Sequence, residues 1–194
     1  EVALGGASVW IALLVGAICG MIMSLIHAFA SISLNADQTI SGTGINLIVN
    51  GITIFMAQIL FNADRTQPYQ MGMKPIMSLG GIYPTAFIAL AVVLIVWFVM
   101  YKLPFGLRLR ACGEHPQAAA SVGIKVKKIR YIAVLTSGFL GGLAGGCLVL
   151  TQTIQFTSTT INGAGFIALA AVSFGRWRPA GISLSSLLFG AAVA

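Results

Sequence analysis

The polar residues inside the apolar stretches of this sequence are the first candidates for a binding function. Asn46, Asn50 and Thr53 recur at positions i, i+4 and i+7, which lie on one face of a helix. A stripe of uncharged hydrogen-bonding groups suits a neutral polar solute such as a sugar or a nucleoside. Hydrogen bonding between helices explains such a stripe equally well, and the sequence leaves both interpretations open. Thr136, in a later apolar stretch, is a fourth candidate pathway residue.

Motifs for catalysis and for metal binding are absent from the sequence. There is no HExxH, no Walker A sequence and no GxSxG, since the segment 181–185 departs from the last pattern at its final position. Cys19, Cys112 and Cys147 form no CxxC pair and indicate neither a disulfide framework nor a zinc site. We therefore expect no catalytic residue, no metal ligand and no cofactor on this chain.

The composition places these residues in a membrane. Of the 194 residues, 58% are hydrophobic and 8% are charged, whereas soluble domains are about 25% charged. A soluble fold of this size could not hide so much apolar side chain from water. The sequence therefore predicts an all-α fold, a polytopic bundle of transmembrane helices.

Stretches without Asp, Glu, Lys or Arg define about six spans or part-spans. A helix needs about 20 residues to cross the hydrocarbon core, and one long charge-free stretch breaks at the polar run 151–162. The expected spans are Leu4–Ile26, Ile40–Phe61, Ile82–Tyr101, Tyr131–Leu150, the shorter Gly163–Phe174, and a segment from Ala180 to Ala194. We expect 1–194 to be a single transmembrane domain and a fragment that lacks spans at both ends.

The basic residues fall mainly on one side of this bundle. Because successive spans alternate direction, loops 27–39, 102–130 and 175–179 share one face. Nine Lys and Arg residues lie on that face, against Arg65 and Lys74 on the other. The positive-inside rule makes the basic face cytoplasmic. The net charge of +7 is then mainly a topology signal, and we expect contact with the lipid bilayer rather than with nucleic acid.

The spans themselves contain no carboxylate and no Lys or Arg. Secondary transporters driven by protons or sodium usually keep such a group in the membrane, so its absence argues against a self-powered transporter. Gly138, Gly142 and Gly146 step by four, which lets two helix backbones approach closely. We expect helix packing within the subunit there, and a surface that slides during transport is the alternative.

The segment 102–130 carries signals for a short helix at the basic face. Pro116 suits the first helical position, and Gly123 suits the left-handed residue after the end. Glu114 precedes the start, where the helix dipole favours negative charge. The sequence predicts a helix over Pro116–Val122, and a helix so short needs a surface to dock against.

At this point the sequence resembles a known family. The run Phe105-Gly-Leu-Arg-Leu-Arg-Ala-Cys-Gly-Glu-His-Pro-Gln-Ala-Ala119 with Gly123-Ile124 is similar to the cytoplasmic signature of binding-protein-dependent ABC transporter permeases. These serve simple sugars, branched-chain amino acids and nucleosides. Three further stretches match in order: His27-Ala-Phe with Ala36–Gly42 and Asn46, Ser137-Gly138 to Gly146, and Gly165–Ala171 with Phe174–Pro179. Among these branches, the segments Ala36-Asp-Gln-Thr39 and Gly113-Glu-His-Pro116 most resemble those of bacterial nucleoside permeases.

The resemblance implies an importer with separate parts. A second permease subunit, identical or paralogous, completes the pathway. An ABC ATPase holds ATP and magnesium on the cytoplasmic side, and an extracellular or lipoprotein solute-binding protein delivers the solute. The short helix becomes a coupling helix, with the ATPase-coupling residues Gly113, Glu114, His115, Pro116, Ala118, Ala119, Gly123 and Ile124. The resemblance thus implies ATP-driven import of nucleosides, with purine nucleosides as the expected cargo, across a bacterial cell membrane. Import of a simple sugar such as ribose or galactose by the same machinery is one alternative, and an ATPase-independent channel or facilitator is another.

Overall fold

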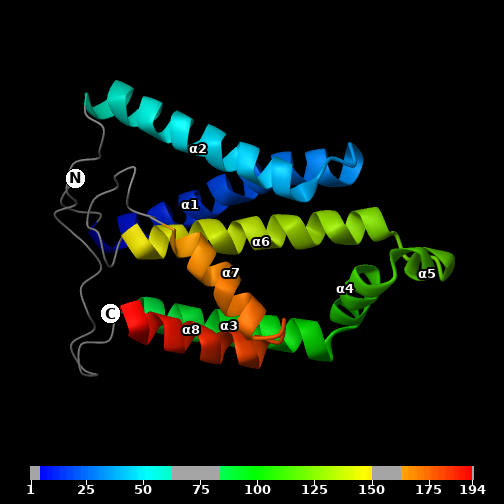
Figure 1. Cartoon of the computed structure of the whole chain (residues 1–194). Helices are drawn as coiled ribbons and strands as arrows, with labels where there is room; N and C mark the ends of the chain where they lie inside the picture. Colours follow the sequence, from blue (N-terminus) through cyan, green and yellow to red (C-terminus); the bar gives the residue numbers. More distant parts are fainter. Residues whose placement is uncertain (1–4, 63–83, 150–162, 194) are drawn as a thin grey trace.

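The computed structural model describes residues 5–62, 84–149 and 163–193 of the chain. The described parts are helical throughout, apart from short connections (Figure 1). The elements are α1 (Gly5–Ala28), the π-helix η2 (Phe29–Ser33), α2 (Gln38–Phe61), α3 (Pro84–Lys102), α4 (Pro104–Glu114), α5 (Pro116–Ser121), α6 (Val126–Leu148), α7 (Ala164–Phe174) and α8 (Pro179–Val193).

The predicted spans and part-spans are confirmed as apolar helices, four of them long. Four segments are long and apolar enough to cross a membrane: Trp10–Ser33, Gln38–Leu60, Thr85–Lys102 and Val126–Leu148. The helices α7 and α8 are apolar but shorter. Large apolar side chains cover the outside of these helices, as expected for surfaces that face lipid or other helices. The polar run 151–162, and Arg65 and Lys74, lie outside the described residues.

The boundaries differ from the prediction at the basic face. The first span does not stop at residue 26, because α1 continues to Ala28 and then widens into η2. The segment 102–130 is not a loop with one short helix: α4 fills its first half, and α6 already begins at Val126. Pro104 occupies the first turn of α4, where its missing N–H costs no hydrogen bond.

A seam of small residues joins α1 to α6, the most extensively packed pair of described helices. Ala17 is fully buried there. A Cβ added to Gly142 would touch the carbonyl oxygen of Gly16 and come 3.0 Å from the Cα of Ala17. Gly138 faces Ser24 and Gly20 of α1, and Gly146 faces Leu13. The three stepped glycines therefore lie on the α6 face that contacts α1.

The remaining helices extend this pair. The helices α7 and α8 pack against each other as a hairpin. Within it, the rings of Phe174 and Phe189 meet edge to face with centroids 5.6 Å apart. The helices α3 and α8 lie side by side (Figure 1). At the other side, α2 approaches α1 at its own N-terminal end and diverges from it along its length (Figure 1). A hydrogen bond of 3.0 Å between His27 Nδ1 and Ser41 Oγ joins α1 to α2 near that approach.

Candidate functional site

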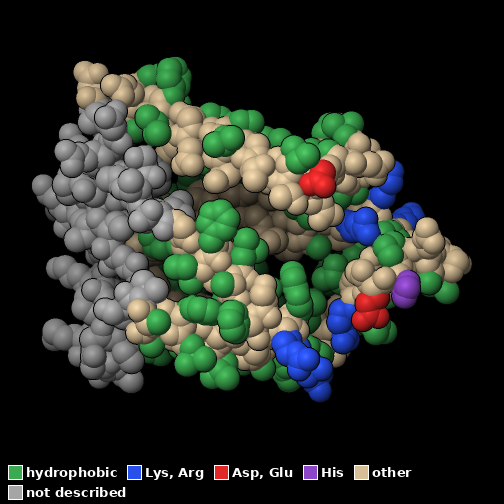
Figure 2. All heavy atoms as spheres, viewed as in Figure 1, with side chains coloured by type: hydrophobic (Ala, Val, Ile, Leu, Met, Phe, Trp, Pro, Cys, Tyr) green, Lys and Arg blue, Asp and Glu red, His purple; other side chains and the backbone are tan. Residues whose placement is uncertain are grey.

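The end of the bundle that carries α4 and α5 holds all the described basic residues. The turns after η2 and α7 and the whole segment between α3 and α6 lie at this end (Figure 1). The Lys and Arg side chains gather there, away from the opposite end (Figure 2). They are Lys102, Arg108, Arg110, Lys125, Lys127, Lys128, Arg130, Arg176 and Arg178. The only described acidic residues, Asp37 and Glu114, are at the same end. The grouping of loops deduced from alternating spans is thus present in the structure.

The helix predicted from Pro116 is present at the outer tip of this end. It is α5, with Pro116 in its first turn, and it ends one residue earlier than predicted, at Ser121. Gly123 has a φ of 83°, the left-handed conformation expected of it. Its backbone N–H donates to the carbonyl of Ala120 over 3.0 Å, and that of Ile124 donates to Ala119 over 3.1 Å. These bonds satisfy carbonyls that the end of a helix leaves without partners.

A small core holds α5 against the rest of the chain. Cys112 of α4, Ala119 of α5 and Ile129 of α6 are buried together, and Leu109, Ala111, Ile124 and Val126 pack around them. Only 1% of Cys112 and 4% of Ala119 are exposed. The short helix therefore has its docking surface within its own chain, on α4 and the first turn of α6. This platform of α4, α5 and the start of α6 fixes the orientation of the outer face of α5.

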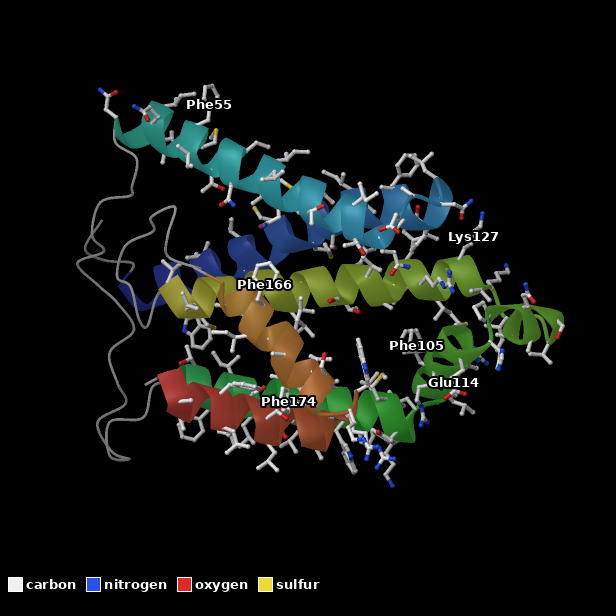
Figure 3. The ribbon with its side chains drawn as sticks, in the orientation of Figure 1. Phe55, Phe105, Glu114, Lys127, Phe166 and Phe174 are labelled. Carbon is white, nitrogen blue, oxygen red and sulfur yellow. The ribbon has the colours of Figure 1, made fainter. Side chains whose placement is uncertain are left out.

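The eight expected coupling residues divide between this core and the surface. Glu114, which Figure 3 labels at the end of α4, is exposed, as are Gly113, His115, Ala118 and Gly123. Pro116 and Ile124 are half-buried, and Ala119 belongs to the core. A hollow of about 250 Å³ lies beside α5, lined by Ala111, Glu114, His115, Ala118, Ala119, Val122 and Ile124. Val122 is 74% exposed at its edge. The site thus presents an apolar hollow with one carboxylate and one imidazole beside it.

The expected pathway residues lie on two helices and away from this site. Asn46 and Asn50 are exposed on α2, and Thr53 is half-buried, with its hydroxyl donating to the carbonyl of Val49 over 2.6 Å. The Thr136 hydroxyl of α6 bonds the carbonyls of Ile132 and Ala133, each at 2.9 Å. Both threonines therefore satisfy their hydroxyls within their own helices, whereas the two asparagine side chains are open to a ligand or to another helix.

Three features of the basic end were not predicted. The Arg110 guanidinium lies 5.0 Å from the ring centroid of Tyr101, a cation–π contact that ties α4 to α3. The hydroxyls of Ser33 and Tyr131 lie 2.6 Å apart and connect η2 to α6.

The third feature is the N-terminal cap of α2, in which Asp37 accepts hydrogen bonds from the backbone N–H groups of Thr39 and Ile40. The N–H groups of Ile40 and then Thr39 hold the pKa of Asp37 below its ordinary value. Of the three features, only this cap has a signal in the local sequence, because an aspartate directly precedes an apolar run.

Comparison with known proteins decides the family. Residues 2–194 match the family described as "Branched-chain amino acid transport system / permease component". The chain belongs to this permease family. It is 45% identical to the guanosine ABC transporter permease protein NupQ of Bacillus subtilis, over 96% of this chain and 63% of that protein. It is 40% identical to the nucleoside ABC transporter permease protein NupC of Lactococcus lactis, over 96% of this chain and 62% of the relative.

A third relative of this permease is named for another solute. The putative glucose ABC transporter permease protein TsgC13 of Haloferax volcanii is 34% identical, over 93% of this chain and 58% of that protein. The chain thus spans less than two thirds of the length of each of these three relatives. No solved structure matches it.

Proposed function

We propose that this chain is the membrane-spanning permease subunit of a binding-protein-dependent ABC importer for nucleosides, with purine nucleosides as its cargo. The observation that carries the proposal is the similarity over nearly the whole chain to permeases named for guanosine and for nucleosides. The family match over residues 2–194 includes the segment that folds into α4 and α5. Neutral amide groups at Asn46 and Asn50 are compatible with a neutral, polar cargo.

The basic end of the bundle is the cytoplasmic end in this proposal. Its nine Lys and Arg residues follow the positive-inside rule. The protein then lies in the cell membrane with α5 projecting inward, where a soluble ATPase subunit can reach it. A second permease subunit and an extracellular or lipoprotein binding protein complete the transporter.

The coupling step uses α5 as a contact with that ATPase. Its outer face, with Ala118 and Val122 exposed beside Glu114, fits a shallow cleft on a partner. Because Ala119 and Cys112 anchor the helix to α4 and α6, a displacement of α5 moves both of those helices with it. The α6 helix in turn packs on α1 along the seam of small residues. Alternating access then follows from a two-state change that the ATPase drives. ATP and magnesium are held by the ATPase and not by this chain.

Import of a sugar by the same machinery is the second candidate. It is favoured by the relative named a putative glucose permease, which is less similar to this chain than the two nucleoside relatives are. An ATPase-independent channel or facilitator is the alternative of another class.

Uptake by reconstituted vesicles distinguishes the nucleoside importer, the sugar importer and the ATPase-independent channel. The full-length permease, its ATPase and its binding protein are placed in vesicles, and entry of guanosine, adenosine, uridine, ribose and glucose is measured with and without ATP. The proposal predicts ATP-dependent entry of purine nucleosides above the other solutes. Preferential entry of a sugar supports the second candidate, and entry without ATP or ATPase contradicts an importer.

A further inference from the structure

The turn between α7 and α8 has an unusual backbone and an unusual exposed side chain. Arg176 and Trp177 have φ values of 52° and 58°, a left-handed region that bulky residues rarely adopt. Hydrogen bonds hold this turn: the N–H of Arg176 donates to Ser173 over 3.1 Å, and that of Arg178 donates to Gly175 over 3.1 Å. Trp177 is 78% exposed, more than any other large apolar residue in the described parts of the chain. The hydrogen-bonded turn thus holds Trp177 at an exposed position between Arg176 and Arg178.

The surroundings of Trp177 are strongly basic. Arg176 and Arg178 flank it, and α3, which lies beside α8, ends at Lys102. Arg110 stacks on Tyr101 one residue before that end. Neither Asp37 nor Glu114, the only acidic residues described, forms an ion pair with any of these four cations. The positive charge of this corner is therefore not neutralised within the described parts of the chain.

An apolar surface continues from this corner into the membrane-spanning part. Phe174, labelled in Figure 3, is 74% exposed at the end of α7, and its ring meets that of Phe189 on α8 edge to face. Further along the hairpin, an open hollow of about 260 Å³ between α7 and α8 is lined by Ala164, Ile167, Ala168, Ala171, Ser186, Phe189 and Gly190. Cations at one end and an apolar groove beyond them match a ligand with an anionic head and an apolar tail.

We propose that this corner binds anionic phospholipid. Arg176, Arg178 and Lys102 contact the phosphate-bearing headgroup, and the indole of Trp177 lies at the headgroup level, where tryptophan is favoured. An arginine fork bonds phosphate oxygens in a bidentate manner, and an acyl chain lies along the groove between α7 and α8. An acidic protein surface would match the cations but would leave this groove unfilled. The proposal requires only that the chain spans a membrane, so it does not depend on the cargo or on the ATPase.

Quenching of Trp177 fluorescence by brominated lipids tests this site. In the assembled full-length transporter, every other tryptophan, including Trp10 and Trp97, is replaced by phenylalanine. The protein is placed in vesicles that contain either brominated phosphatidylglycerol or brominated phosphatidylcholine at the same mole fraction. We expect phosphatidylglycerol to quench Trp177 preferentially, and the preference to fall in R176Q/R178Q by roughly fivefold for each charge removed.

Two matched variants separate charge from folding. R176K/R178K keeps both charges and should retain most of the preference. K127Q/K128Q removes two exposed charges from the start of α6, away from this hairpin, and should leave the preference unchanged. Equal quenching by the two lipids overturns the proposal, as does a preference that survives in R176Q/R178Q. Failure of both lipids to quench Trp177 also overturns it, because a protein partner then covers the corner.

Discussion

Gly20 of α1 and Gly142 of α6 lie in backbone contact. A Cβ added to Gly20 would come 2.8 Å from the Cα of Gly142 and 2.9 Å from its nitrogen. Both neighbouring atoms belong to backbone, so neither can move aside as a flexible side chain would. This contact fixes the distance between α1 and α6, and through α6 it connects the membrane-spanning part to the platform that carries α5.

Adding one methyl group at this contact should destabilise the bundle. We expect Gly20→Ala and Gly142→Ala to lower the free energy of unfolding by about 1–3 kcal/mol each, as overpacking does. Thermal unfolding of the purified full-length protein in detergent measures the effect. Gly141→Ala and Gly145→Ala are matched controls, because a Cβ at either position meets nothing within 4 Å among the described residues. Equal destabilisation by all four variants would contradict a specific α1–α6 seam.

Ala118 and Ala119 are adjacent in α5 but should respond differently to a larger side chain. Ala118 is exposed, so Ala118→Trp should leave the stability unchanged and reduce ATP-driven uptake by about 5–150-fold, the usual range of a coupling free energy. Ala119 is buried with Cys112 and Ile129, so Ala119→Leu should cost about 1–3 kcal/mol of stability. Uptake in vesicles and thermal unfolding measure the two effects. Ala180→Trp, at an exposed position of α8, is the control and should not reduce uptake.

If Ala118→Trp transports at the normal rate, the outer face of α5 has no role in coupling. If it unfolds as readily as Ala119→Leu, the division of the two alanines between surface and core is wrong.

The cap of α2 should give the protein a dependence on acid pH. Backbone N–H groups lower the pKa of Asp37 in the folded protein, so its charge stabilises the fold above the ordinary pKa of 3.8, and the stabilisation is lost as the pH falls through the lower, folded value. We expect Asp37→Asn to unfold at a lower temperature than the natural protein at pH 6, and the difference to shrink below about pH 3.8. A difference that grows on acidification would show that the charged carboxylate destabilises the cap.

The hydroxyl pair of Ser33 and Tyr131 should couple η2 to α6. The two oxygens lie 2.6 Å apart and are separated by 98 positions in the sequence. A double-mutant cycle with Ser33→Ala and Tyr131→Phe should give an interaction of about 0.5–1.5 kcal/mol, the net contribution of a hydrogen bond. Chemical unfolding of the four proteins measures it, and strict additivity of the two substitutions would exclude the bond.

Much of the bundle follows from the sequence because charge is so costly in a membrane. The charge-free stretches place the ends of α2 and α3 within about two residues, and Pro116 and Gly123 place those of α5 within about one. The start of α6 lies earlier than predicted, at Val126, because Lys127, Lys128 and Arg130 interrupt the charge-free pattern there. The helix α4 was missed because Arg108, Arg110 and Glu114 interrupt any apolar pattern there, and it is stabilised by packing of Cys112 against distant residues. Such tertiary contacts leave no periodic signal in a single sequence.

The glycine stripes show a second limit of the sequence. Gly138, Gly142 and Gly146 have the same four-residue step as Gly141 and Gly145, yet only the first set meets α1. Spacing reports that two residues share a helix face, but it does not select the face that meets a neighbour. For the same reason the stripe of Asn46, Asn50 and Thr53 did not reveal that Thr53 bonds within its own helix.

Cross-linking from position 118 tests the central proposal most directly. Ala118→Cys is introduced into the full-length transporter after Cys19, Cys112 and Cys147 and any other cysteines of the permease have been replaced, and a short thiol–amine cross-linker is added to membranes that contain all subunits. The coupling role of α5 predicts a cross-linked product of permease and ATPase from position 118. It predicts none from a cysteine at the exposed position 55, which lies toward the end of α2 that is remote from α5 (Figure 3). Absence of the product at position 118, in a transporter that still takes up guanosine with ATP, would contradict it.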